Sequence, residues 1–129
     1  MSAVSADGQP GIGSEVWVKV ARESEVSAGY SLWLVIKVPY VGHPPSARFY
    51  AKAKIEFPVG NEKIFKFPMK DSTVGSTRDF LIVLADPTAR PSLEENLAND
   101  GVTAWDVKRD VLPTGTKTIS TLSVEKTRP

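Results

Sequence analysis

The chain has 129 residues, no cysteine and a formal net charge of +1. This length fits one ordinary domain, able to bury about two-thirds of the surface that its unfolded form would expose. Because cysteine is absent, disulfide bridges and thiolate metal sites are excluded, and the fold must depend on its apolar core. The small net charge argues against specific or general nucleic-acid binding. No apolar run approaches the roughly 20 residues of a membrane-spanning helix.

The ends of the chain differ in composition from its middle. Residues 1–13 are small, polar and glycine-rich, which predicts a flexible leader. One β-sandwich domain is expected over 14–126, and a frayed tail over 127–129. The leader lacks the apolar segment of a signal peptide, so the compartment stays unknown, with the cytoplasm slightly favoured.

The first strands are predicted from alternation and from apolar content. Val16, Val18 and Val20 alternate with less apolar residues, as in a strand with one face on a core. The stretch 30–38 is apolar or aromatic at every position except two, and it is bounded by glycine and proline. Because both of its alternating sets are largely apolar, it should be a central strand covered on both faces.

Two alternating stretches follow a proline-rich loop over 39–46. In 48–57 the small and apolar residues should share one face, and the basic residues a solvent-exposed one. A turn at 58–61 leads to 62–69, whose phenylalanines share a face. The two stretches are expected to pair as a hairpin-like unit.

The last third contains the second central strand, over 79–85, as the neighbour of 30–38. A capping-box spacing from Ser92 to Glu95 predicts a short helix at about 92–100, with Leu93 and Leu97 on its buried face. In the final strand, from 117 to about 126, Ile119 is out of phase with the later apolar residues. This strand should therefore carry a bulge or use both faces.

Short strands separated by turns, with one helix, indicate an all-β fold: an antiparallel immunoglobulin-like β-sandwich. A small barrel is the alternative. The chain also resembles a bacterial immunoglobulin-like accessory domain of cyanobacterial and actinobacterial multidomain proteins. The resemblance rests on Leu32-Trp33-Leu34-Val35, Phe49-Tyr50, Phe80 to Asp86 with Leu93 and Leu97, and Leu112-Pro113-Thr114-Gly115. It implies a noncatalytic module that serves other proteins, and it brings no catalytic residues.

Motifs of catalysis are missing from the sequence. His43 is the only histidine and lies in a proline-rich loop, where the sequence identifies no partner for a metal ion or for general-base chemistry. Glu94 and Glu95 diverge by about 100° on a helix, so they do not form an acid pair. We therefore expect no enzyme activity, no cofactor and no bound metal.

Two surface features suggest binding. Basic residues predominate over 48–70 and acidic residues over 94–110, a segregation that could steer a partner or support association of copies. The alternative is that these lysines only protect sheet edges from aggregation. The aromatic residues could instead form a sugar-stacking platform, with Tyr40 and Tyr50 the best candidates; the others considered are Trp17, Trp33 and Trp105.

The sequence thus predicts a noncatalytic protein-recognition or assembly module. Its partner would be another protein or a copy of itself, bound through the loop 39–47 and the basic strands, or by strand addition at an open sheet edge. The alternative is a carbohydrate-binding module with a glycan as ligand. The candidate binding residues are Tyr40, His43, Arg48, Tyr50, Lys52, Lys54 and Lys66.

Overall fold

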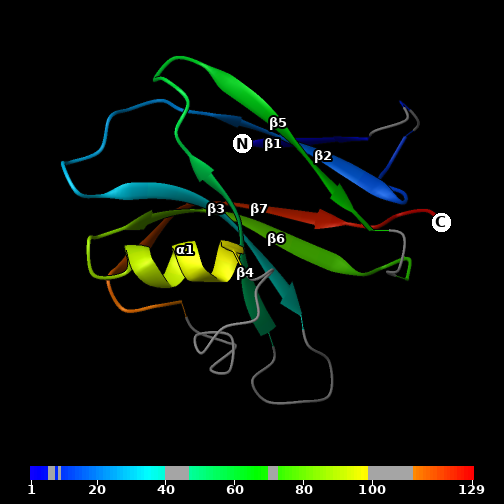
Figure 1. Cartoon of the computed structure of the whole chain (residues 1–129). Coiled ribbons are helices and arrows are strands. Elements are labelled where there is room, and N and C mark those ends of the chain that lie inside the picture. Colours follow the sequence, from blue (N-terminus) through cyan, green and yellow to red (C-terminus); the bar gives the residue numbers. More distant parts are fainter. Residues whose placement is uncertain (6–7, 9, 40–46, 70–72, 99–111) are drawn as a thin grey trace.

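The structure, a computed structural model, describes residues 1–5, 8, 10–39, 47–69, 73–98 and 112–129 (Figure 1). Its strands form two antiparallel sheets that pack face to face. The three-stranded sheet has the order β1 (Ser2–Ser5), β2 (Glu15–Ala21), β5 (Glu62–Pro68). The four-stranded sheet has the order β4 (Ala47–Ile55), β3 (Ser31–Pro39), β6 (Thr77–Ala85), β7 (Thr116–Glu125), and helix α1 spans Arg90–Ala98. The prediction of an all-β fold of two sheets with one short helix is confirmed, and the barrel alternative is wrong.

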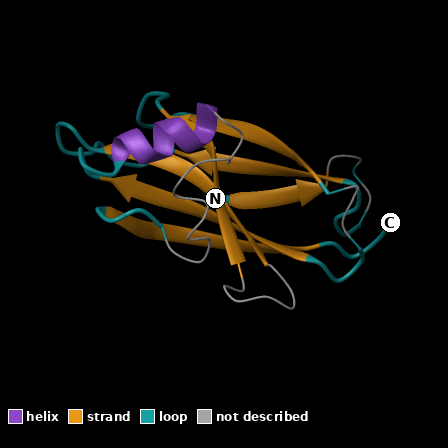
Figure 2. Ribbon diagram, turned by 60° about the horizontal axis from the view of Figure 1, so that its bottom comes forward, coloured by secondary structure: helices purple, strands orange, loops and turns teal. Residues whose placement is uncertain are grey.

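The four-stranded sheet is covered on both faces (Figure 2). Leu32, Leu34 and Ile36 of β3 pack against β2 and β5 in what we call the inter-sheet core. Trp33 and Val35, on the opposite face of β3, pack with α1 in the helix-side core. β6 pairs with β3 and contributes to both cores in the same way. The prediction that 30–38 is a central strand covered on both faces, with 79–85 as its neighbour, is confirmed.

A β-bulge in β4 changes which residues share a face. Leu34 pairs with Ala53 but Val35 pairs with Ala51, so Lys52 is the extra residue. A bulge reverses the alternation of side chains. Phe49 and Ala51 therefore belong to the helix-side core, whereas Ala53 contacts the inter-sheet core. The expectation of one continuous apolar face along 48–57 is wrong for this reason.

The predicted hairpin of 48–57 with 62–69 is also wrong. β4 pairs with β3, and β5 pairs with β2, so the two strands lie in different sheets. The turn itself forms as expected, with the Asn61 N–H donating to the Pro58 carbonyl at 3.1 Å. Its glycine, Gly60, has a φ of 89°, and its N–H donates to the Arg22 carbonyl. This turn carries the chain from one sheet to the other.

The helix begins earlier than the capping-box spacing predicts. The Asp86 Oδ1 accepts hydrogen bonds from the Thr88 and Ala89 N–H groups at 2.9 and 2.8 Å. Asp86 thus caps the turn that leads into α1, and Ser92 lies inside the helix. The buried face is also different, because Leu93 and Asn96 are buried whereas Leu97 is exposed.

Asn96 is the polar residue of that buried face. Its Oδ1 accepts a hydrogen bond from the Ala51 N–H at 2.8 Å. Ala51 is next to the bulge in β4, where backbone groups are not all used by strand pairing. The side chain of Asn96 therefore supplies an acceptor that the ladder does not.

The ends of the chain show more order than their composition predicts. Residues 2–5 form β1, antiparallel to β2, although we expected a flexible leader over 1–13. The Thr127 N–H donates to the Ile12 carbonyl at 2.9 Å, and the Arg128 Nε donates to the Pro10 carbonyl at 3.1 Å. These hydrogen bonds join residues 127 and 128 to the segment that precedes β2. The predicted bulge in the final strand is confirmed, because Ile119 is unpaired between Thr118 and Ser120.

Candidate binding groove

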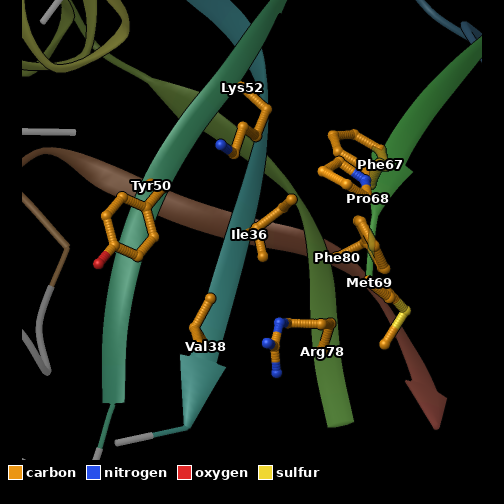
Figure 3. A pocket seen from close by; sticks show the side chains of 9 residues that line it. All are labelled: Ile36, Val38, Tyr50, Lys52, Phe67, Pro68, Met69, Arg78 and Phe80. Carbon is orange, nitrogen blue, oxygen red and sulfur yellow. The ribbon is translucent and has the colours of Figure 1, made fainter. Parts of the chain in front are cut away.

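A groove opens between the two sheets where β4 has no strand above it (Figure 3). β1 contacts β7 at one side of the sandwich, so β5 lies toward β4 at the other side. Because one sheet has three strands and the other four, β5 leaves the inner face of β4 uncovered around Tyr50 and Lys52, whereas Ala53 and Ile55 pack in the inter-sheet core. The groove has a volume of about 220 Å³, and its walls are Ile36, Val38, Tyr50, Lys52, Phe67, Pro68, Met69, Arg78 and Phe80.

The floor of the groove is apolar. Ile36 and Phe80 are buried residues of the inter-sheet core, and the rings of Phe67 and Phe80 lie 4.9 Å apart between centroids. Tyr50 pairs with Ile36 across β3 and β4, so it faces the same side of the sheet. An apolar side chain placed here would lose its hydration against a preformed surface.

The two charged side chains that the structure describes in the groove wall are both cations. Lys52 is exposed, and its Nζ lies 5.8 Å from the centroid of the Tyr50 ring. Arg78 donates from Nη1 to the Thr77 carbonyl at 2.8 Å. Among the residues of the groove wall that the structure describes, none is an aspartate or a glutamate. The combination of an apolar floor and cationic walls favours a ligand that is both apolar and anionic.

The predicted binding residues separate in space. Tyr50 and Lys52 meet in the groove. Lys54 lies on the helix side of the four-stranded sheet, and Lys66 on the outer face of the three-stranded sheet, where its Nζ is 4.7 Å from the centroid of the Trp17 ring. Arg48 lies in β4 opposite Val38. The positions of Tyr40 and His43, like most of the acidic stretch 94–110, fall outside the described residues.

Lys54 belongs to a network of ion pairs that joins β4 to α1. Its Nζ lies 3.2 Å from Glu56 Oε1 and 4.0 Å from Glu94 Oε1. Glu94 in turn accepts a hydrogen bond from Arg90 Nε at 2.7 Å. The hydrogen bond from Arg90, with a smaller contribution from Lys54, lowers the pKa of the Glu94 carboxyl. All of these groups are partly exposed, so the network is weakly stabilising.

The lowered pKa of Glu94 leads to a pH-dependent prediction. Replacing Arg90 by alanine should raise the pKa of Glu94 toward its ordinary value, because the main cause of the shift is removed. In the native protein this carboxylate contributes stability above its unfolded-state pKa, and the contribution is lost as pH falls through the folded pKa. NMR titration of the Glu94 side chain in the native protein and in Arg90→Ala should show the shift. An unchanged Glu94 titration in Arg90→Ala would contradict this assignment.

Sequence reasoning missed Arg78 and the apolar floor. Arg78 has the same parity as Phe80 and Ile82 in β6, so all three face the inter-sheet side. The alternation of side chains along β6, continued two residues before Phe80, predicts that Arg78 faces the inter-sheet side. The floor residues gave no signal, because Ile36 and Phe67 look like ordinary core residues until the widths of the two sheets are known.

Within the described ranges, no group of three or more histidine, aspartate or glutamate side chains could hold a metal ion. In the same part of the chain, no helix has the length and apolar character needed to cross a membrane. Comparisons of the chain with models of protein families, with curated proteins and with solved structures found no match.

Proposed function

We propose that this chain is a noncatalytic recognition or assembly module, built on an immunoglobulin-like sandwich, that binds a protein partner in the groove. The observation that carries the proposal is the groove itself, where apolar surface lies beside Lys52 and Arg78 at the uncovered part of the inner face of β4. Buried apolar anchors in such a pocket supply most of the free energy of typical protein complexes. Cations at its walls select partners by charge and increase their association rate.

The strand order supports the immunoglobulin-like part of the proposal. The order β1-β2-β5 corresponds to strands A-B-E of an immunoglobulin domain, and β4-β3-β6-β7 to C′-C-F-G. In this correspondence strand D, which would lie beside β5, is missing. The helix between β6 and β7 is an addition to that plan.

Sugar binding, the alternative, has less support. Trp33 is buried, and its Nε1 donates to the Ser31 Oγ at 2.8 Å. The Trp17 ring lies under Lys66 and the Tyr50 ring beside Lys52, so a lysine competes for each ring. A sugar platform needs open aromatic faces, whereas a groove suits a side chain of a protein.

Sedimentation across protein concentration, at low and high salt, tests assembly of copies. If copies bind one another through the groove, the mass should rise with concentration and fall with salt. Lys52→Glu should abolish the association, because it reverses a charge in the groove wall. Lys117→Glu is the matched control, since Lys117 is an exposed residue of β7 outside that wall.

A chain that stays monomeric at every concentration restricts the proposal to a foreign protein. Titration with soluble glycans, followed by tyrosine and tryptophan fluorescence, separates the remaining alternative. A saturable change that is lost in Tyr50→Ala would replace the proposal by carbohydrate binding.

A further inference from the structure

We infer that the partner is an extended strand of another protein, with alternating apolar and acidic residues, which pairs with the free edge of β5. This inference depends on the proposed recognition function and specifies the ligand of the same groove. The added strand would make the three-stranded sheet four-stranded and would cover the part of β4 that lines the groove. Strand addition of this kind uses backbone hydrogen bonds for affinity and alternate side chains for specificity.

The backbone of β5 has an unused edge beside the groove. Among the described strands, β5 pairs with β2 alone. The Met69 N–H donates to the Ser14 carbonyl at 2.7 Å, which shows that Met69 directs its polar groups toward β2. Because this direction alternates along an antiparallel strand, Ile64 and Lys66 direct their N–H and C=O groups toward the free edge. Pro68 also falls on the free edge, where the lack of an N–H is tolerated.

The edge of β4, across the groove, is less suitable. The Ala51 N–H already donates to Asn96 Oδ1 at 2.8 Å, and α1 lies against this strand. A covered edge of this type does not accept another strand. The free edge of β5 is therefore the better place for an added strand.

The side chains on the two faces of β5 define what the added strand should carry. Its inward residues would lie beside Phe65 and Phe67 and above Tyr50, so they should be apolar. Its outward residues would lie beside Ile64 and Lys66, and at the start of β5 beside Glu62, whose Oε1 is 3.6 Å from Lys19 Nζ. Lys66 is exposed, and its Nζ lies over the ring of Trp17. Carboxylates on the outward face therefore complement Lys66, and Lys52 adds positive charge on the groove side.

A second copy of this chain fits the edge poorly. Pairing β5 with β5 of a copy about Ile64 would set Glu62 of each chain opposite Lys66 of the other, but it would also place the inward Lys63 of the copy beside the apolar Phe65, where a charged group is costly. None of the described strands alternates apolar with acidic residues. The complementary strand must therefore come from a different protein.

The probe for this inference is a capped octapeptide of alternating valine and glutamate, titrated into the full chain by calorimetry. Saturable binding is expected, with NMR shifts at the Ile64 and Lys66 amides. Ile64→Pro should weaken binding about fivefold, because it removes one edge donor worth about 1 kcal/mol. Ile64→Ala is the matched control, since it removes the side chain but keeps the N–H. Because this N–H is not used by β2, the proline variant should remain folded, which thermal unfolding checks.

Two further peptides complete the design. A valine and lysine octapeptide should not bind, and neither should the valine and glutamate peptide methylated on the backbone nitrogens that face β5. If Ile64→Pro unfolds, the methylated peptide still tests whether backbone hydrogen bonds to β5 hold the peptide, because this comparison leaves the protein unchanged.

The outcomes separate the inference from the proposed function. Strand addition is overturned if the acidic peptide binds Ile64→Pro and Ile64→Ala with the same affinity. It is also overturned if the methylated peptide binds as tightly as the unmethylated one. In both cases recognition in the groove stands. If no peptide binds, or the lysine peptide binds equally, the acidic strand is overturned as the partner. The sedimentation of Lys52→Glu tests, without any peptide, the form of the proposed function in which copies of the chain assemble.

Discussion

Replacement of Trp33 by alanine is expected to lower the free energy of unfolding by about 3–5 kcal/mol, the usual cost of removing a large buried aromatic side chain. Trp33 is 1% exposed and fills the centre of the helix-side core. Its loss also leaves the buried Ser31 Oγ without the donor that Trp33 Nε1 provides. Against a typical total of about 5–15 kcal/mol, this loss would be a large fraction of the stability.

Urea unfolding followed by circular dichroism measures this effect. Trp17→Ala is the control, because it removes the same side chain from the outer face of the three-stranded sheet, where Trp17 is only half-buried. Trp17→Ala should lower the free energy of unfolding by about 1 kcal/mol or less, mainly because the contact with Lys66 is lost. Equal losses in the two variants would mean that α1 does not form a second core with the four-stranded sheet.

Asn96→Ala is expected to lower the free energy of unfolding by about 1–3 kcal/mol, the cost of leaving a buried donor without its acceptor. The Ala51 N–H would lose Oδ1 of Asn96 at a site where β4 is bulged. Leu97→Ala is the control, because the adjacent Leu97 is 36% exposed and should change stability less.

Hydrogen exchange gives this prediction a local readout. The Ala51 amide should exchange faster in Asn96→Ala, whereas the Val83 amide in the central β6 should change only as far as global stability does. If the Ala51 amide loses no more protection than the change in global stability predicts, this hydrogen bond does not hold the edge of β4.

The sequence was most informative where the apolar pattern was strong on both faces. β3 and β6 have apolar residues at consecutive positions, which only a doubly covered strand explains. The bulge at Ile119 was also readable, because one apolar residue was out of phase with its neighbours. Such features depend on local composition alone.

Pairing between distant strands was not readable in the same way. β4 and β5 are joined by a short turn, which favoured a hairpin, yet each pairs with a strand earlier in the chain. The bulge at Lys52 left no sign, because alanines stand on both sides of it and fit either face. Asn96 resembles an ordinary solvent-exposed helix residue until its distance to Ala51 is known.

The candidate site was predictable in part for the same reasons. Basic residues on 48–57 identified Tyr50 and Lys52, but the bulge sends Lys54 to the other side of the sheet. Lys66 belongs to the opposite sheet because β5 is not the partner of β4. The groove arises from the difference in width between the sheets, which no single stretch encodes.

The position of β3 has a consequence for the order of folding. During synthesis β3 can pair early with β4, the next strand along the chain, but its other neighbour, β6, emerges only after β5. Contacts between distant segments form slowly, because a long loop must close first. Until β6 arrives, β3 presents an unpaired edge with apolar side chains on both faces, a hazard for association between nascent chains. The basic residues of β4 are adjacent to β3 from the start, and their mutual repulsion would keep such chains apart while the sheet is incomplete.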